Sequence, residues 1–118
     1  MKKPEFTFIK RKDGTSEFEE FLMSIPKSDR VKLLATIEAT EQNGLLIARK
    51  QKWVRKLDDN LYELRSKVAT NIQRAIYFHV EDNQYKITHG FTKKTQKTPP
   101  KELKKGKKIR DTFLESRD

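Results

Sequence analysis

The N-terminal part of the chain carries apolar residues at the spacing of one helical face. Ser16 and Glu19 form a capping box ahead of them and Pro26 follows, so we expect a helix that begins at Ser16 and ends before Pro26. A short extended segment at residues 6–10 and an Asp-Gly turn at residues 13–14 should precede this helix. The apolar positions, at i, i+3, i+4 and i+7, are Phe18, Phe21, Leu22 and Ile25.

Two further helices follow from the same kind of pattern. One is predicted to start at Ser28 and to stop at Gly44, with an apolar stripe of Val31, Leu34, Ala35 and Ile37. The other should start at the proline pair 99–100 and run nearly to the end. Gly106 lies near the centre of its stripe, where a small residue would let the helix approach a sheet closely. The stripe consists of Leu103, Gly106, Ile109, Arg110, Phe113 and Leu114.

Between these helices the pattern changes to runs rich in aromatic and β-branched residues. Short groups of Asp, Asn, Ala and Thr separate the runs and supply turn residues. This texture predicts an antiparallel meander of four strands. The expected strands are residues 53–57, 61–68, 72–80 and 84–92.

The length of 118 residues fits one domain, residues 1–118, of the α+β class. The chain has no cysteine, which excludes disulfides and a thiolate zinc site. It also lacks an 18-residue apolar span and an N-terminal apolar run of the signal-peptide kind. We therefore expect a cytoplasmic protein that does not engage a membrane.

Positive charge is concentrated in the middle of the chain. The sequence has 27 Lys and Arg against 17 Asp and Glu, a formal net charge of +10. Residues 1–41 are balanced at eight of each sign, residues 42–101 hold thirteen basic and five acidic side chains, and residues 102–118 hold six and four. No Asp or Glu occurs in residues 83–101. A localised basic field suits nucleic acid, an anionic membrane or an acidic protein, whereas a solvated lysine surface is the alternative.

A register argument places two arginines side by side in the predicted sheet. If the turn between the second and third strands of the meander centres on residues 69–70, Arg65 lies opposite Arg74 and Glu63 opposite Ile76. Glu63, Arg65, Lys67 and Arg74 then share one face. Two facing guanidinium groups repel, and a phosphate between them would relieve the repulsion bidentately. The alternative is that Glu63 satisfies one arginine and solvent the other.

The next hairpin gives similar expectations. A two-residue turn at Asp82-Asn83 would set Phe91 opposite Arg74 and bring Lys93 near both arginines. The same turn pairs His79 with Lys86 and His89 with Ile76. The imidazoles would then point to opposite faces, which disfavours a ribonuclease that uses one histidine as base and the other as acid.

Other candidate chemistry is sparse. No H-x-x-x-H or H-E-x-x-H pair and no Walker loop occurs, and the scattered acids do not support a two-metal cluster. We expect neither a metal nor a cofactor. Aromatic residues in strands can stack on exposed bases, but they more often fill a core. The residues in question are Trp53, Tyr62 and Tyr77.

Several motifs occur in a recognisable order. They are LDDNLYELRS at 57–66, QRAIYF at 73–78, ITHGFTKKTQKTPP at 87–100 and a last helix beginning KELKKG. This series resembles the phage-derived branch of the RelE/HigB toxins of bacterial toxin–antitoxin modules over about the last 65 residues, whereas the first 55 match in layout only. Gln73 departs from the pattern where relatives often have an aromatic residue, and Gly106 where they usually have alanine.

The resemblance implies a RelE-like α+β fold: a curved antiparallel sheet of about four to five strands with two N-terminal helices and one C-terminal helix. It also implies an mRNA endonuclease that acts in the ribosomal A site. A cognate helix-turn-helix antitoxin would block it, and operator DNA would be contacted only through that antitoxin. Carried over by position, the catalytic cleft would contain Arg65, Arg74, Lys93 and Lys94, with Glu63 as an addition.

The mechanism expected from this cleft needs no metal. The 2′-hydroxyl would attack the adjacent phosphate while the arginines hold the developing charge, with Glu63, Lys93 or Lys94 as open choices for proton transfer. Three further lysines would bind backbone phosphate without reading sequence: Lys56, Lys67 and Lys97. Two alternatives are a ParE-like gyrase inhibitor and a nucleic-acid-binding protein without enzymatic activity.

Overall fold

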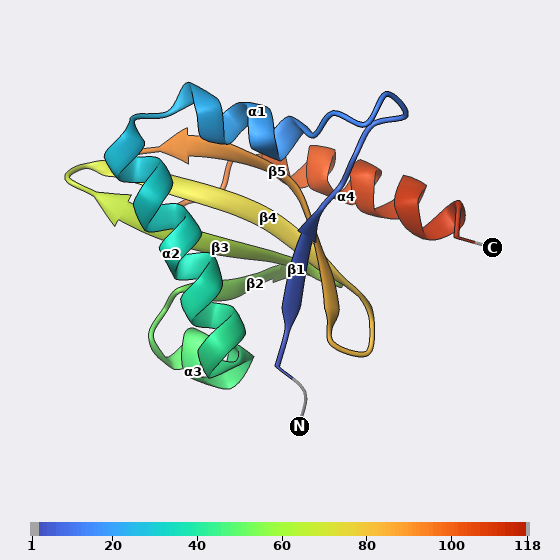
Figure 1. Cartoon of the computed structure of the whole chain (residues 1–118), viewed down its shortest axis with the longest axis horizontal. Coiled ribbons are helices and arrows are strands. Elements are labelled where there is room, and N and C mark those ends of the chain that lie inside the picture. Colours follow the sequence, from blue (N-terminus) through green and yellow to red (C-terminus); the bar gives the residue numbers. More distant parts are fainter. Residues whose placement is uncertain (1–2, 118) are drawn as a thin grey trace.

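The computed structural model describes residues 3–117, so residues 1, 2 and 118 of the predicted domain lie outside the described part. Five strands form one sheet in the order β1-β5-β4-β3-β2, and four helices pack around it (Figure 1). The α+β class expected from the sequence is confirmed. The strands are β1 (Glu5–Phe8), β2 (Val54–Asp58), β3 (Leu61–Val68), β4 (Asn71–Glu81) and β5 (Gln84–Lys93); the helices are α1 (Glu17–Ser24), α2 (Lys27–Asn43), α3 (Leu45–Lys50) and α4 (Pro100–Glu115).

The sheet is mixed rather than purely antiparallel. The predicted meander β2-β3-β4-β5 is antiparallel throughout, but β1 pairs with β5 in parallel, with Phe6 beside Tyr85. The chain reaches the far edge of the sheet with β1 and then passes through three helices before it enters β2 at the other edge (Figure 1). The helices between β1 and β2 therefore cover one face of the sheet.

Each sheet face has its own apolar core. On one face, Phe18 of α1 and Leu33 of α2 are fully buried together with Leu64 and Tyr77 of the sheet. On the other face, Leu61, Ile76 and Phe91 pack beneath α4, mainly against Leu103. Because side chains alternate along a regular strand, these two clusters assign the sheet residues outside the strand irregularities to the α1/α2 face or to the α4 face.

The helix termini mostly follow the predicted signals. The Ser16 hydroxyl accepts a hydrogen bond of 3.2 Å from the Glu19 amide and caps α1, as the capping box predicts. Gly44 follows α2 with φ 90° and donates its amide to the Thr40 carbonyl over 2.9 Å. A second helix, α3, starts directly after this glycine and was not predicted, because its six residues are too few to show a helical period.

The apolar stripe predicted for α2 is right at Ile37 and wrong at its other three positions, Val31, Leu34 and Ala35, which are exposed. Val31 is 57% exposed and Leu34 is 40% exposed, whereas the buried positions are Asp29, Leu33, Ile37 and Thr40. Half of this buried face is polar, so apolar residues alone indicated the wrong side. The Asp29 carboxylate accepts a buried hydrogen bond of 2.7 Å from the Gln73 side chain, which joins α2 to the sheet.

A bulge in β5 changes one of the predicted strand pairings. His89 lies opposite Ile76 and Ile87 opposite Tyr77, which leaves Thr88 as an extra residue. His79 consequently pairs with Tyr85 and not with Lys86 as predicted. Because the predicted register assumed a regular ladder, it holds for residues 72–76 of β4, fails for residues 77–79, and is recovered at the Glu81–Gln84 pair after a second irregularity between His79 and Glu81.

Gly106 sits where α4 approaches the sheet. A Cβ atom built there would lie 2.9 Å from Ile76 Cγ2 and 3.4 Å from Leu61 Cδ1. Both neighbours are fully buried, so neither can move away easily. The close approach predicted from the sequence is therefore present.

We expect Gly106→Val to lower the free energy of unfolding by about 2–3 kcal/mol, because overpacking at a rigid contact costs more than glycine's poor helix propensity. Lys108→Val, at an exposed position of α4, is the matched control and should cost only a few tenths of a kcal/mol. Urea unfolding of the two variants measures the difference. Equal stabilities would show that α4 does not dock at Gly106.

Candidate functional site

Arginines from three adjacent strands converge on the α4 face of the sheet. Arg55 of β2 lies opposite Glu63 of β3, and Arg65 of β3 lies opposite Arg74 of β4. The predicted pairings of Arg65 with Arg74, of Glu63 with Ile76 and of Arg74 with Phe91 are confirmed. The sheet thus gathers three guanidinium groups around one carboxylate.

Glu63 is the centre of this arginine network and has no exposed surface. Its Oε2 accepts a hydrogen bond of 2.9 Å from Arg55 Nε, and its Oε1 accepts one of 2.7 Å from the Thr98 hydroxyl. Arg74 Nη1 lies 3.4 Å from the same Oε1. Both carboxylate oxygens are therefore occupied by residues of the chain itself.

The segment between β5 and α4 covers the arginine network. Arg74 donates to the Thr95 carbonyl, and Arg55 Nη2 donates to the Gln96 carbonyl over 2.7 Å and to the Thr98 hydroxyl over 3.1 Å. Arg65 Nη1 donates to the Gln96 side-chain oxygen over 2.6 Å. Residues 95–98 thus bind arginines of β2, β3 and β4 as they cross the sheet.

Arg74 is fully buried beneath this segment. Its guanidinium lies 5.8 Å from the ring centroid of Phe91, and its Nε finds no hydrogen-bond partner within residues 3–117. Burial lowers the pKa of Arg74 below its usual range, and the nearby Arg55 and Arg65 add to this, while Glu63 opposes it. The sequence left open whether a bound phosphate or Glu63 supplies the negative charge beside the arginines. In the structure, Glu63 supplies it for Arg74.

Arg65 differs from the other two arginines. It is half-buried, and no carboxylate of residues 3–117 lies within 4.0 Å of it. Lys93 follows Phe91 by two positions on β5, so it shares the α4 face, and Lys94 continues into the covering segment. Both lysines are exposed. The accessible positive charge near the arginine network therefore comes from Arg65, Lys93 and Lys94.

The three lysines predicted to bind backbone phosphate do not share one place. Lys67 is exposed two residues beyond Arg65 on the same strand face, and Lys97 is exposed within the covering segment. Lys56 pairs with Tyr62, which packs on the α1/α2 face, so Lys56 points away from the arginine network. The sheet brings together Glu63, Arg65 and Arg74 and separates Lys56 from them.

Sequence reasoning missed Arg55 and Thr98, which both bind Glu63 directly. A register argument centred on Asp59 would have placed Arg55 opposite Glu63. No comparable signal exists for Thr98, because its position depends on how an irregular segment crosses the sheet.

The two histidines lie on opposite faces, as predicted. His79 packs on the Tyr85 ring, and its Nε2 lies 2.8 Å from the Asp82 carbonyl oxygen. His89 is buried on the α4 face, with Nδ1 2.8 Å from the Thr88 hydroxyl and Nε2 3.3 Å from Glu102 Oε1. Neither imidazole contacts an arginine of the network, so the geometry offers no histidine acid–base pair there.

The candidate stacking rings are largely committed to the core. Tyr77 is 1% exposed, and Tyr62 stacks on it with 5.3 Å between ring centroids. Burial raises the pKa of the Tyr77 hydroxyl well above its usual range. Trp53 directly precedes β2 and is half-buried against the same core.

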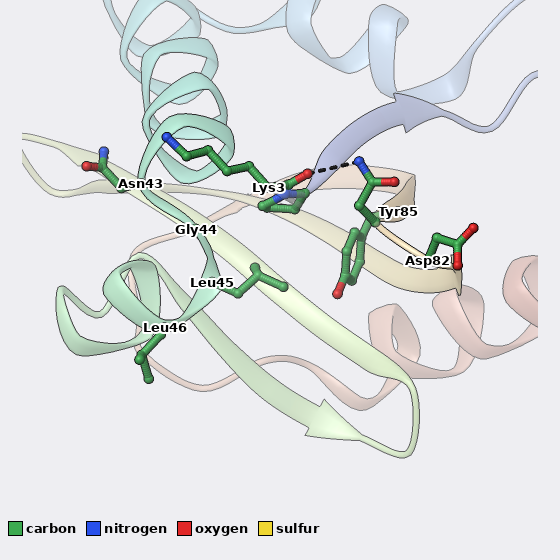
Figure 2. Close-up of a pocket in the computed structure, with 9 residues that line it drawn as sticks. Lys3, Asn43, Gly44, Leu45, Leu46, Asp82 and Tyr85 are labelled. Carbon is green, nitrogen blue, oxygen red and sulfur yellow. Dashed lines mark hydrogen bonds between the residues drawn. The ribbon is translucent and has the colours of Figure 1, made fainter. Parts of the chain in front are cut away.

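A cavity of about 670 Å³ opens elsewhere on the molecule (Figure 2). It lies between the start of β1, the α2–α3 junction and the β4–β5 turn, where Asn83 donates a hydrogen bond of 3.0 Å to the Lys3 carbonyl. No residue of the arginine network lines it. Within residues 3–117, no three His, Asp or Glu side chains gather as a metal site would require, and no helix has the length and apolarity to cross a membrane.

Fold and site together define a small, basic α+β protein that concentrates arginines around one buried carboxylate on a sheet face. The family model described as "Phage derived protein Gp49-like (DUF891)" matches residues 20–111, and the chain belongs to this family. The family is associated with toxin–antitoxin modules. No curated protein matches the chain significantly.

We expect Glu63→Gln to lower the free energy of unfolding by about 3–5 kcal/mol, because it leaves the fully buried Arg74 without a counter-charge. Glu38→Gln, on the exposed surface of α2, should change it by less than about 0.5 kcal/mol. Thermal or urea unfolding gives both values. A Glu63 variant as stable as the Glu38 control would mean that the ion pair does not hold the sheet face together.

Stability should also fall as the pH drops below about 6.5 because of His89. Burial lowers the pKa of His89, an effect that Lys105 reinforces and that Glu102 and Glu17 oppose. The unfolded chain therefore binds the proton more readily, and stability is lost as the pH falls below the unfolded value of about 6.5. One proton limits the slope to about 1.4 kcal/mol per pH unit. His89→Gln should weaken this pH dependence of the free energy of unfolding, measured by unfolding curves at several pH values, whereas His79→Gln should leave it in place.

Proposed function

We propose that this protein is the toxin of a toxin–antitoxin module and that it inhibits translation by cutting mRNA on the ribosome. The observation that carries the proposal is the arginine network, in which Arg55 and Arg74 share the Glu63 carboxylate and the neighbouring Arg65 has no carboxylate partner among residues 3–117, which leaves an excess of positive charge. The family association with toxin–antitoxin modules supports it. The basic middle of the chain agrees with a polyanionic substrate.

Arg65 is the first group that an incoming phosphate would meet. It is half-buried, and among residues 3–117 its guanidinium donates to the neutral side chain of Gln96 and to no carboxylate. Arg74 lies directly across the ladder from it. A phosphate offers anionic acceptors to a planar fork of donors, which makes a stronger contact than an amide oxygen does. Held there, Arg65 would stabilise the charge that develops when the 2′-hydroxyl attacks the phosphorus.

Arg74 would enter the reaction by an exchange of acceptors. At present its guanidinium binds the Thr95 carbonyl and the Thr98 hydroxyl, both of which belong to the covering segment. If RNA displaces residues 95–98, phosphate oxygens take the place of these neutral acceptors. Glu63 would remain beneath Arg74 and fix its direction, which is the preorganisation that electrostatic catalysis requires.

Two kinds of side chain near the arginine network could transfer the proton: exposed lysines and the buried Glu63. Lys93 and Lys94 are exposed and need no displacement to reach a substrate. Glu63 is fully buried and would act as a base only after the same segment moves. Lys67 and Lys97 would hold backbone phosphates beside the cleft, whereas Lys56 faces the other side of the sheet and would need a different stretch of RNA.

The ribosome would supply the orientation that weak acid–base groups do not. Positioning the message in the A site places the 2′-hydroxyl and its phosphate against the cleft, and such positioning lowers the barrier. The reaction would use no metal ion. The toxin would act in the cytoplasm, and a cognate helix-turn-helix antitoxin would neutralise it and contact operator DNA.

A second candidate function is a nucleic-acid-binding protein that does not cut. The observation that favours it is the closure of the Glu63–Arg74 pair, since both side chains have no exposed surface and already bind each other. Incubation with translating ribosomes separates the two, because a binding protein leaves the message intact. A ParE-like gyrase inhibitor would instead block DNA supercoiling by purified gyrase.

We expect Arg65→Ala to reduce mRNA cleavage about 10²–10³-fold without unfolding the protein, because it removes one charged donor from the cleft. Growth arrest on induced expression and primer extension of mRNA ends measure the loss. Arg65→Lys should recover only part of the activity, since it restores the charge and not the fork.

The control for this experiment is Lys104→Ala, an exposed position of α4, which should arrest growth like the original protein. A folded Arg65→Ala variant that cuts at the same sites with the same efficiency would remove Arg65 from the mechanism.

A further inference from the structure

A second, smaller cavity adjoins the arginine network. Its volume is about 280 Å³ and it lies at the edge of β3, beyond the start of β2. The last ladder contact before this edge is the Arg65 amide, which donates to the Trp53 carbonyl over 2.9 Å. Beyond it, α2 approaches the open strand, and Lys32 Nζ donates to the Lys67 carbonyl over 2.6 Å. We call this cavity the edge pocket.

Positive charge surrounds the edge pocket. Its lining includes Lys32 from α2, Lys52 from the α3–β2 connection, and Arg65 and Lys67 from β3. No Asp or Glu lines it. Lys32 commits one of its three donors to a backbone carbonyl, and Lys52 and Lys67 are exposed. Four cations around one cavity repel one another, and an anion within it would relieve that repulsion.

The wall of the edge pocket also carries an unused polar group. Ser66 is 6% exposed, and its hydroxyl has no hydrogen-bond partner within residues 3–117. A buried hydroxyl without a partner loses free energy relative to one that is hydrogen-bonded, so a ligand acceptor there would be favoured. Trp53 and Ile72 supply apolar surface, and the Gln96 amide adds a second polar group.

We propose that the edge pocket binds one nucleotide of single-stranded RNA next to the phosphate held by Arg65. Its phosphate would lie among Lys32, Lys52 and Lys67, and its base would lie against Trp53. A nucleotide has a phosphate that suits the four cations and a planar base that suits the Trp53 indole. An acidic side chain of a protein partner would suit only the cations. A cavity of this volume holds one nucleotide and not a folded RNA element.

Arg65 connects the edge pocket to the arginine network. It lines the pocket, and it also lies opposite Arg74 and binds Gln96, which lines the pocket as well. An RNA strand bound to both the edge pocket and the arginine network would therefore pass over Arg65, with one nucleotide on each side of it. This inference rests on the proposed function, since it assigns a flanking site to the same RNA strand.

The test uses the single tryptophan of the chain as its reporter. A short 2′-O-methyl oligoribonucleotide binds without being cut, because the attacking hydroxyl is blocked. We expect it to quench Trp53 fluorescence, and an analogue with one abasic position should quench less. Ser66→Ala should weaken binding about 3–10-fold, since one hydrogen bond to a charged group is lost.

Lys52→Asn removes one charge from the pocket and suits the left-handed backbone at this residue, where φ is 64°. It should reduce the slope of log K against log salt by about 0.7, the value for one phosphate contact of a single strand. Lys108→Asn, on the exposed surface of α4, is the matched control and should leave the slope unchanged.

Two results would overturn the inference. One is oligonucleotide binding, seen by anisotropy of a labelled strand, that neither quenches Trp53 nor depends on Lys52. The other is a glutamate-rich peptide that quenches Trp53 at lower concentration than the oligonucleotide, which would assign the pocket to an acidic protein partner. A protein that cuts mRNA without Trp53 quenching refutes only the edge pocket, and one that shows quenching but never cuts refutes only the endonuclease.

Discussion

The buried ion pair between Glu63 and Arg74 is the contact on which the rest of the site depends. Two charges without exposed surface are tolerated inside a protein only when hydrogen bonds satisfy them, because their removal from water costs several kcal/mol each. Arg55 and Thr98 complete the set around Glu63, and Thr95 accepts from Arg74. Because both buried charges need hydrogen-bond partners, Arg55 of β2 and the irregular segment of residues 95–98 are held in one arrangement.

This arrangement couples the connection between β5 and α4 to the positive surface. Residues 95–98 bind arginines of three strands, so they cover the most buried guanidinium and leave Arg65, Lys93 and Lys94 accessible. A phosphate competes for the same donors as the segment does, and it carries the charge that the segment lacks. Phosphate and residues 95–98 thus compete for the same arginine donors, so substrate can enter only where this segment gives up its hydrogen bonds.

Much of the sheet could be predicted because short turns transmit register over long distances. The turn at residues 69–70 was enough to place Arg65 opposite Arg74, and the turn at residues 82–83 placed Phe91 beside Arg74. Prediction failed where a residue was inserted, at Thr88, and where a helix buried polar residues, at Asp29 and Thr40 of α2. Both failures concern tertiary packing that overrides a local period.

The sequence by itself determined the elements other than α3, the antiparallel meander and the gathering of Glu63, Arg65 and Arg74, because hydrophobic period and turn residues act locally. Only the tertiary structure decided that Glu63 and Arg74 satisfy each other, that Arg55 and Thr98 join them, and that Lys56 faces away. It also decided that Trp53, Ser66 and four cations from α2, β3 and the α3–β2 connection enclose a pocket. The physical reason is that burial and pairing of charges depend on which distant segments meet, and no local pattern encodes that meeting.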